Sequence, residues 1–262
     1  MIIDIHTHID EEQHFHSYMK KTNGRIGLVF VLHWYKNDFN KLRLFIDSKP
    51  NLRLIAGLNM DNPKHIEERL AELEVLLQQK KIVGLKLYPG YQHFFVSEQK
   101  VFPVAKLCLK YDKPLVIHSG DVYDLENEAV LKYSHPVYAD ELAVLFPDLK
   151  IVLAHFSFPH LLECANIVSK NKNVYTDISG TIVDDLPKRE AENLYKEYKR
   201  DMQRVLNYFP DIRSKIMFGT DYGGEDTPLN EVEMYIRLVK EVFAKKEQEH
   251  VFSGLAQELF LS

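Results

Sequence analysis

The feature that most constrains the fold of this chain is a short apolar run followed by a stretch with helical periodicity, which recurs eight times. The runs are rich in β-branched residues and leucine, and most are apolar throughout. This pattern is typical of parallel strands that are buried on both faces. The eight runs are Ile2–His6, Ile26–Leu32, Leu52–Leu58, Ile82–Tyr88, Pro114–His118, Ile151–His155, Val174–Ile178 and Ile216–Asp221.

The segments between the runs have the pattern of amphipathic helices. In Arg189–Phe209, for example, Tyr198 and Met202 recur at helical spacing opposite a charged face. Strands that alternate with helices predict βαβ units and a parallel sheet. Eight such units favour an α/β fold with a single closed (β/α)8 TIM barrel, and 262 residues match the usual barrel length of about 250. Six strands would fit an open doubly wound sheet equally well, so the prediction depends on all eight runs being strands.

Composition excludes several classes of protein. Apolar residues make up 45% and charged residues 27% of the chain, which is typical of globular rather than disordered proteins. The net charge of −5 gives no basic footprint for nucleic acid or an anionic membrane, and we expect a small-molecule substrate. No apolar run approaches the roughly 20 residues of a membrane span. No linker or low-complexity tract divides residues 1–262, which predicts one domain. The N-terminus lacks a basic segment ahead of an apolar run, which indicates a cytoplasmic protein.

Polar side chains lie at the ends of four of the apolar runs, and Lys86 lies near the end of a fifth. In a closed barrel, functional residues gather where the strands end, and residues two apart on a strand point to the same face. A buried polar group costs several kcal/mol unless it is paired or bound to a metal. Imidazoles and a carboxylate are ligands of zinc and related divalent ions. We therefore predict a metal centre from the side chains that end these runs: His6, His8, His118, His155 and Asp221.

The ordered motifs resemble those of the metal-dependent amidohydrolase superfamily, and most of all its amidohydrolase-related (amidohydrolase 2) branch. Asp4–His8 is similar to the opening HxH motif, and Phe218–Tyr222 is similar to the closing one. The middle motifs follow in the expected order: Gly84–Pro89, Val116–Gly120, Phe146–His155 and Asn173–Gly180. The resemblance covers essentially the whole chain. It implies a metal-dependent TIM barrel that either hydrolyses amides and lactones or decarboxylates its substrate without oxidation.

Two positions depart from that branch. His155 is followed by Phe156-Ser157-Phe158, where the branch usually has a glycine-rich turn. Leu255 stands where the branch commonly has Asn. Both departures concern the substrate and the local packing rather than the metal.

Lys86 stands inside an otherwise apolar run, and two interpretations are open. The run also resembles that of dihydroorotase, in which the equivalent Lys is carboxylated and bridges two metal ions. That resemblance implies a first ion held by His6, His8 and Asp221, and a second held by His118 and His155. The alternative is a protonated Lys86 that binds a substrate carboxylate or Asp4, as the resemblance to the mononuclear branch suggests. One or two ions per chain, with zinc as the first expectation, are compatible with the sequence, because carboxylation is not encoded as a residue.

The reaction expected first is attack of metal-activated water on an amide, lactone or ester. Asp221 is the expected proton acceptor and donor, and in a mononuclear centre His155 would polarise the carbonyl or the water. Asp4 is expected to orient a metal ligand. One alternative is a non-oxidative decarboxylase, a lyase with a mononuclear centre that releases CO₂. Another is a metal-binding barrel without catalysis, against which the retained Asp221 argues.

Loop residues are expected to line a polar and aromatic pocket around the substrate. The favoured substrate-binding residues are Lys86, Tyr88, Trp34 and His93. Tyr91, Phe94 and further histidines follow the strand runs in the same way: His14, His16, His33, His135 and His160. A homodimer is compatible with such a barrel, although no apolar stripe in the sequence specifies one.

Overall fold

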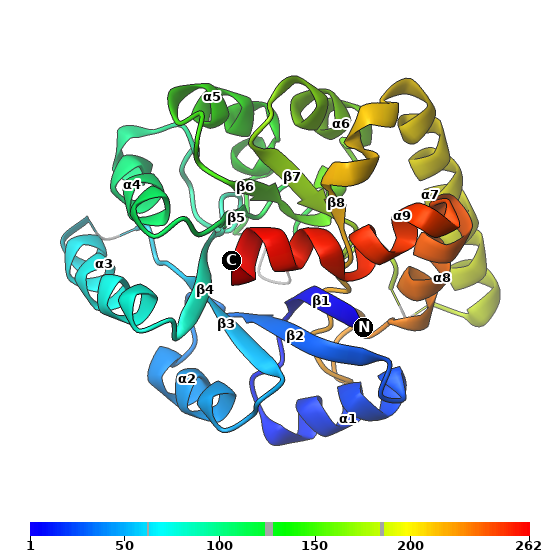
Figure 1. Cartoon of the computed structure of the whole chain (residues 1–262), viewed down its shortest axis with the longest axis horizontal. Coiled ribbons are helices and arrows are strands. Elements are labelled where there is room, and N and C mark those ends of the chain that lie inside the picture. The colour runs from blue at the N-terminus through cyan, green and yellow to red at the C-terminus, as the bar shows by residue number, and fades with distance from the viewer. Residues whose placement is uncertain (62, 124–127, 184–185) are drawn as a thin grey trace.

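The computed structural model describes residues 1–61, 63–123, 128–183 and 186–262. Eight parallel strands form one sheet in the order in which they occur in the chain, and helices surround it (Figure 1). The strands are β1 (Ile2–Thr7), β2 (Ile26–Leu32), β3 (Leu52–Gly57), β4 (Ile82–Leu87), β5 (Leu115–Ile117), β6 (Ile151–Leu153), β7 (Val174–Asp177) and β8 (Ile216–Met217). The predicted (β/α)8 barrel of the α/β class is therefore confirmed.

Hydrogen bonds between the first and last strands bring the two edges of the sheet together. The backbone N–H of Ile5 donates to the carbonyl of Phe218 at 3.2 Å, and that of His8 donates to Tyr222 at 2.7 Å. The last strand is shorter than the predicted run to Asp221, because the chain leaves the extended conformation after Met217. The polar residues at the end of this run therefore lie in the loop beyond the strand.

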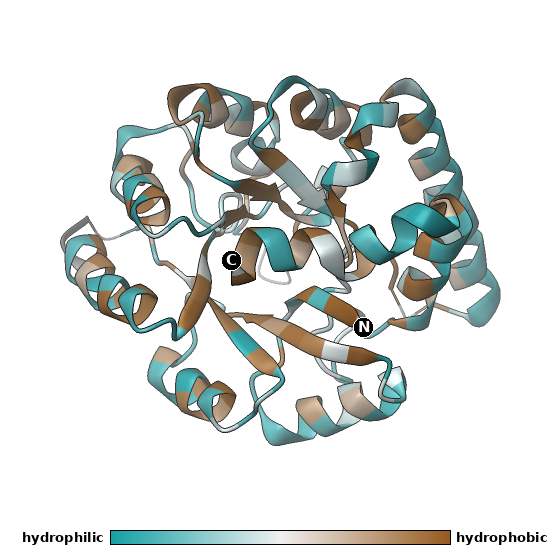
Figure 2. Cartoon of the chain, viewed as in Figure 1, coloured by the Kyte–Doolittle hydropathy of each residue, from teal (hydrophilic) through white to brown (hydrophobic). Residues whose placement is uncertain are grey.

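Helices alternate with the strands around the barrel. They are α1 (Glu12–Thr22), α2 (Phe39–Asp47), α3 (Pro63–Gln78), α4 (Phe102–Lys110), α5 (Val137–Leu145), α6 (Leu161–Lys170), α7 (Lys188–Tyr208), α8 (Glu233–Val242) and α9 (Lys245–Glu249). Hydrophobic residues dominate the strands, whereas the helices carry both hydrophilic and hydrophobic residues (Figure 2). In α7, Tyr198, Met202 and Val205 are buried, as the helical spacing predicts.

The C-terminal segment covers the amino end of the barrel. After α9, two irregular helical turns, His250–Gly254 and Gln257–Leu261, lead the chain across the barrel (Figure 1). The ring of Phe260 is fully buried and packs edge-on against Phe30, with 5.1 Å between the ring centroids. The ring also lies against Gly84 in β4, where an added Cβ would be 3.4 Å from Phe260 and 3.0 Å from the carbonyl oxygen of Pro114. Apolar side chains thus close this end.

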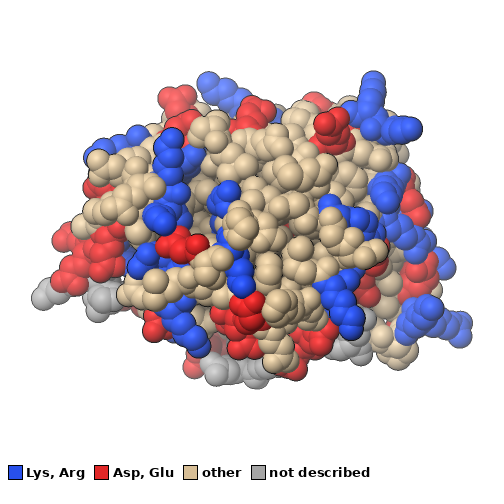
Figure 3. All heavy atoms as spheres, turned by 60° about the horizontal axis from the view of Figure 1, so that its bottom comes forward, with Lys and Arg blue, Asp and Glu red and all other residues tan. Residues whose placement is uncertain are grey.

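The distribution of surface charge and the length and polarity of the helices can be compared with the expectations from composition. On the face shown in Figure 3, basic and acidic side chains are interspersed rather than segregated by sign. Within the described ranges, every helix is too short or too polar to cross a membrane.

Candidate metal centre

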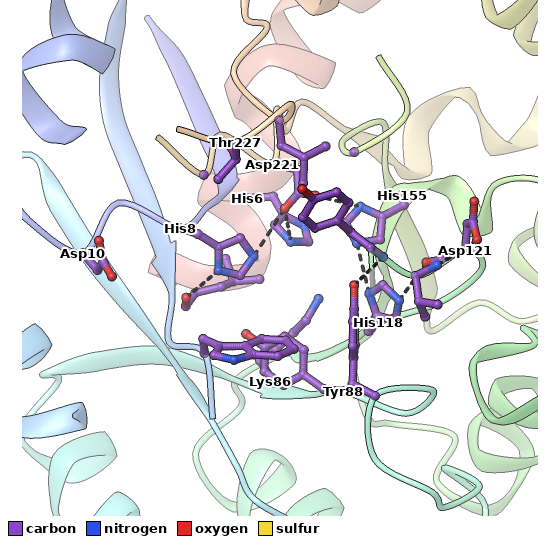
Figure 4. Close-up of a pocket in the computed structure, with 18 of the residues that line it drawn as sticks. His6, His8, Asp10, Lys86, Tyr88, His118, Asp121, His155, Asp221 and Thr227 are labelled. Carbon is purple, nitrogen blue, oxygen red and sulfur yellow. Dashed lines mark hydrogen bonds and ion pairs between the residues drawn. The ribbon is translucent and has the colours of Figure 1, made fainter. Parts of the chain in front are cut away.

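Side chains from three strand ends meet at the carboxyl end of the barrel (Figure 4). His6 lies in β1, His8 follows it, and Asp221 follows β8. The Nε2 atoms of His6 and His8 each lie 3.3 Å from Oδ1 of Asp221. After β6, His155 places Nδ1 3.9 Å from the other carboxylate oxygen of Asp221. The strand geometry therefore brings together the residues that the sequence predicts at these ends.

The hydrogen bonds of His6 and His8 turn one nitrogen of each ring toward Asp221. His8 Nδ1 lies 3.1 Å from the carbonyl oxygen of Leu32, which can only accept, so Nδ1 donates and the tautomer of the neutral ring has its lone pair on Nε2, as a metal ligand requires. His6 Nδ1 lies 3.0 Å from Oδ2 of Asp177 and is oriented in the same way. His6 Nε2 and Asp221 Oδ1 are buried and have no hydrogen-bond partner. Electron pairs that face one another in this way repel unless a cation lies between them, so His6, His8 and Asp221 fit a divalent metal ion.

His118 and His155 form the adjacent part of the cluster. His118 Nε2 donates to the carbonyl oxygen of Asp121 at 2.9 Å, which leaves its Nδ1 facing Nε2 of His155 at 3.2 Å. Burial lowers the pKa of both rings, that of His155 to about 4, although Asp221 raises the latter in part. Both imidazoles are therefore neutral at pH 7, as metal ligands need to be.

Lys86 points into the same space from β4 (Figure 4). Its ammonium is fully buried and has no hydrogen-bond partner; the ring of Tyr88 lies 5.3 Å away. Burial lowers the pKa of Lys86 to about 8, and the carboxylates of Asp177 and Asp221 limit the shift. An unpartnered amine in this position is suited either to a ligand or to a modification.

Asp4 holds together the two chain segments that carry the cluster. It accepts hydrogen bonds from Tyr18 Oη at 2.6 Å and Thr220 Oγ1 at 2.7 Å. It also accepts the backbone N–H groups of His6 and Thr220, each at 3.1 Å. Burial raises the pKa of Asp4 to about 7, against these hydrogen bonds. Asp4 therefore acts on the backbone beside His6 and Asp221, and its partners do not include Lys86.

Asp177 at the end of β7 is the central residue to which the sequence analysis assigned no role. Oδ2 binds His6 Nδ1, and Oδ1 accepts the backbone N–H groups of His155 and Ser179, each at 3.0 Å. Burial would raise the pKa of Asp177, but His6 and His155 outweigh it and hold the pKa well below its usual value. The signal was present, because Asp177 is a carboxylate that interrupts an apolar run, as Asp221 does.

The backbone around the cluster is strained. His155, Phe156 and Ser157 have φ angles of 62°, 48° and 52°, and Asp221 has 64°. A left-handed conformation costs a non-glycine residue roughly 1–2 kcal/mol, and such strain concentrates at functional sites. Phe156 and Ser157 lie in the segment Phe156-Ser157-Phe158, where a glycine-rich turn is usual in the branch that the sequence resembles. At Gly180 the space is essential, since a Cβ would lie 2.4 Å from His155 Nδ1.

Comparison with known proteins agrees with this arrangement. The amidohydrolase family model matches residues 35–260. The chain belongs to the amidohydrolase family. None of the curated proteins matches it significantly.

Solved structures show the same fold across nearly the whole amidohydrolase chain. An uncharacterised TIM-barrel protein from Bordetella bronchiseptica has a TM-score of 0.71 at 15% identity, covering 98% of this chain and 97% of its own. A probable 2-pyrone-4,6-dicarboxylic acid hydrolase from Acinetobacter baumannii has a TM-score of 0.66 at 17% identity, covering 100% and 99%. A 2,6-dihydroxybenzoate decarboxylase from Rhizobium has a TM-score of 0.65 at 12% identity, covering 99% and 98%. Both hydrolases and decarboxylases therefore share this barrel.

A cavity of about 420 Å³ lies above the cluster in this amidohydrolase. Trp34, Lys86, Tyr88 and Tyr91 line it. The first three are among the residues that the sequence analysis favours for substrate binding. His93 does not line it: the side chain is exposed, Nε2 lies 2.8 Å from the carbonyl oxygen of Glu128, and the ring stacks on Tyr133.

The other loop residues divide in the same way. Of the additional histidines expected there, His14 lines the cavity from α1, whereas His16, His33, His135 and His160 do not. Phe94 is in the hydrophobic core. Loop residues were thus located less well than strand-end residues, because loop direction does not follow from the sheet.

Proposed function

We propose that this amidohydrolase is a metal-dependent hydrolase in which activated water attacks the carbonyl carbon of an amide, lactone or ester. The observation that carries the proposal is the convergence of His6 Nε2, His8 Nε2 and Asp221 Oδ1 at 3.3 Å, with His6 Nε2 and Asp221 Oδ1 buried and without a hydrogen-bond partner. These three residues would hold the first ion, and mixed imidazole and carboxylate ligands favour zinc. When bound, a divalent ion lowers the pKa of water toward about 7 and polarises a carbonyl group.

Asp221 and His155 would perform the proton and hydrogen-bond chemistry. Burial would raise the pKa of Asp221, but His155, His6 and His8 outweigh it and hold the pKa well below its usual value. The carboxylate is therefore ionised and able to accept the proton of the attacking water at Oδ2, and then to transfer it to the leaving group. His155, neutral at pH 7, would donate a hydrogen bond to the substrate carbonyl. Asp177 would keep the ring of His6 and the backbone of His155 in place.

The state of Lys86 decides the number of ions. A pKa of about 8 leaves part of Lys86 as the neutral amine, which is the form that reacts with CO₂ to give a carbamate. Carboxylated Lys86 would be one of the residues that hold a second ion, together with His118 and His155. An unmodified Lys86 would leave one ion per chain and its own ammonium free to bind substrate.

The second candidate function is non-oxidative decarboxylation. It is favoured by the buried, unpartnered Nζ of Lys86, which offers a counter-charge to a substrate carboxylate. The decarboxylase from Rhizobium shows that the same barrel occurs with that reaction. Release of CO₂ from an aromatic or vinylic acid would identify this reaction, whereas a hydrolase releases an alcohol or amine and an acid.

The test combines metal analysis with product analysis. We expect one or two zinc ions per chain by elemental analysis, and an added mass of CO₂ on Lys86 by native mass spectrometry if there are two. Screening amides, esters and lactones should then identify a hydrolysed class. A protein that holds no divalent ion after incubation with zinc would disprove the proposal, and would leave a barrel that serves as a binding or scaffold protein.

We also propose the setting in which this enzyme works. It would act as one domain over residues 1–262 in the cytoplasm, on a small-molecule substrate and without nucleic acid or membrane. The absence of a helix able to cross a membrane in the described ranges and the net charge of −5 support this setting. Sedimentation analysis would show whether the enzyme is a homodimer.

A further inference from the structure

One wall of the cavity is a continuous strip of aromatic rings. Trp34 after β2 packs edge-on against Tyr88 and Tyr91, with centroids 4.7 and 4.9 Å away. Tyr91 in turn lies 4.8 Å from the ring of His118, and His118 lies 5.0 Å from His155. The strip therefore runs from the opening of the cavity down to the cluster that would hold the metal.

The hydroxyl groups of both tyrosines in this strip form hydrogen bonds with the backbone, and the rings face the cavity. Tyr88 Oη donates to the carbonyl oxygen of His33 at 2.8 Å, and Tyr91 Oη accepts the backbone N–H of Tyr123 at 2.8 Å. Val183 and Leu229 also line the cavity and add aliphatic surface. Because these side chains present mainly carbon, a bound molecule gains from flat, apolar contact with them.

The charges around the cavity are unfavourable for an anion at its outer part. Among the described residues that line the cavity there is no arginine, and Lys86 is the sole lysine. Lys86 lies next to the metal cluster, whereas Asp10 and Asp121 lie on opposite sides of the cavity (Figure 4). His14 is already paired with Asp10 at 3.0 Å.

Lys36, on the same loop as Trp34, does not supply the missing positive charge. It lies 4.0 Å from Glu128 and does not line the cavity. An acid group away from the metal end would thus lose its hydration next to apolar surface and carboxylates. It would gain no positive charge to compensate for that loss.

We infer that the substrate is a flat aromatic molecule whose scissile group faces the metal and whose remote end carries no acid group. This inference rests on the proposed function for the orientation of the substrate. It excludes dicarboxylates and phosphorylated compounds, and selects aryl amides, aryl esters, aryl lactones or aromatic acids with a single carboxylate at the metal end.

The experiment uses three hydroxamates that share one metal-binding head and differ in the remainder: acetohydroxamate, benzohydroxamate and para-carboxybenzohydroxamate. Trp34 is the single tryptophan of the chain, so its fluorescence reports occupancy of this cavity in the zinc-loaded wild-type enzyme. We expect benzohydroxamate to bind about tenfold more tightly than acetohydroxamate, because it adds contact with the ring strip. We expect the para-carboxylate to weaken binding by about tenfold relative to benzohydroxamate.

Two variants test the two halves of the inference by calorimetry. Trp34→Leu should weaken benzohydroxamate by about tenfold and leave acetohydroxamate unchanged. Asp121→Asn keeps an acceptor for the N–H of Val122 but removes a charge, and should strengthen para-carboxybenzohydroxamate severalfold. Asp148→Asn is the matched control, since Asp148 is exposed and precedes β6 at the opposite end of the barrel.

The remaining outcomes overturn the charge argument, the aromatic argument or the proposed function. Equal or tighter binding of the para-carboxylate overturns the charge argument, and equal binding of acetohydroxamate and benzohydroxamate overturns the aromatic one. Failure of all three probes to bind the zinc-loaded enzyme removes the inference together with the metal-centred function. The expected order of affinities without any hydrolysis keeps the inference and removes only the proposed reaction.

Discussion

The two ends of this barrel bury different kinds of side chain. At the amino end, Phe260 and Leu259 fill the barrel against Phe30, and the buried atoms are carbon. At the carboxyl end, His6, Lys86 and Asp221 are as deeply buried, yet each has a polar atom without a partner. One end is arranged for stability, and the other is arranged for a ligand.

The difference has an energetic consequence. A buried polar atom without a partner costs about 1–3 kcal/mol, whereas a buried aromatic ring is among the largest contributions to stability. The carboxyl end of the metal-free protein is therefore destabilising unless a cation and a substrate compensate. Substitutions at the two ends should separate activity from stability, and the four predictions below depend on that separation.

The largest effect is expected for Asp221→Asn. Asparagine tolerates the left-handed backbone at this position, where φ is 64°, so the variant should fold. It removes the proton acceptor and a metal ligand, and we expect kcat to fall by about 10³-fold or more. Asp226→Asn, an exposed substitution in the same loop, is the control. Retention of a tenth of the activity would show that Asp221 lacks the assigned role.

Phe260→Ala tests the opposite end. The ring is fully buried against Phe30, and its loss should lower the free energy of unfolding by about 3–5 kcal/mol in urea denaturation. kcat per folded molecule should not change, since the substitution lies across the barrel from the metal cluster. Leu261→Ala, at a side chain that is 41% exposed, should cost less than about 1 kcal/mol. A comparable loss of kcat at constant folded fraction would mean that the two ends are coupled.

The success of the sequence analysis follows the same division. Apolar runs predicted all eight strands, because a strand buried on both faces needs continuous hydrophobicity, and the strand ends then placed His6, His8 and Asp221 together. The closing of the amino end by Phe260 was not predicted. A helical segment after the last strand has no pattern that shows which surface it covers.

Residues that depend on loop direction were located poorly. His93 follows β4 as Tyr88 and Tyr91 do, but the loop turns its ring outward onto Tyr133. Asp177 received no role because a second carboxylate was not needed for a plausible ligand set. Its function as an anchor becomes visible only when Nδ1 of His6 is seen to face it.

The third-largest effect is expected for Asp177→Asn, which should lower the affinity for the metal ion. The amide keeps an oxygen for the backbone N–H groups of His155 and Ser179 but places an NH₂ group or a weaker acceptor beside His6 Nδ1. Loss of such an outer partner typically costs 10–100-fold in metal affinity. Competition with a zinc chelator would measure it, with the exposed Asp201→Asn on α7 as control. An unchanged zinc Kd would mean that the ring of His6 is held by packing alone.

The smallest effect concerns Lys86→Met in the metal-free protein. The folded pKa of about 8 lies below the ordinary 10.5, so burial of the ammonium is fully unfavourable below pH 8. Between pH 8 and 10.5 the unfolded chain binds more protons than the folded one, and the wild-type protein gains stability as the pH rises. Lys86→Met lacks this titration and should be more stable than wild type by about 1–2 kcal/mol at pH 7.

The pH dependence separates this explanation from ordinary repacking around residue 86. The advantage of the variant should shrink steadily in urea denaturation as the pH rises from 8 to 10, whereas Lys106→Met, exposed on α4, should show no such trend. An advantage that is constant over this range would mean that methionine simply packs better than lysine, and that the amine is not held at a cost. A decreasing advantage would show that the buried, unpaired amine beside the metal site lowers the stability of the carboxyl end of the barrel. The amino end, where the buried side chains are apolar, has no such unfavourable group.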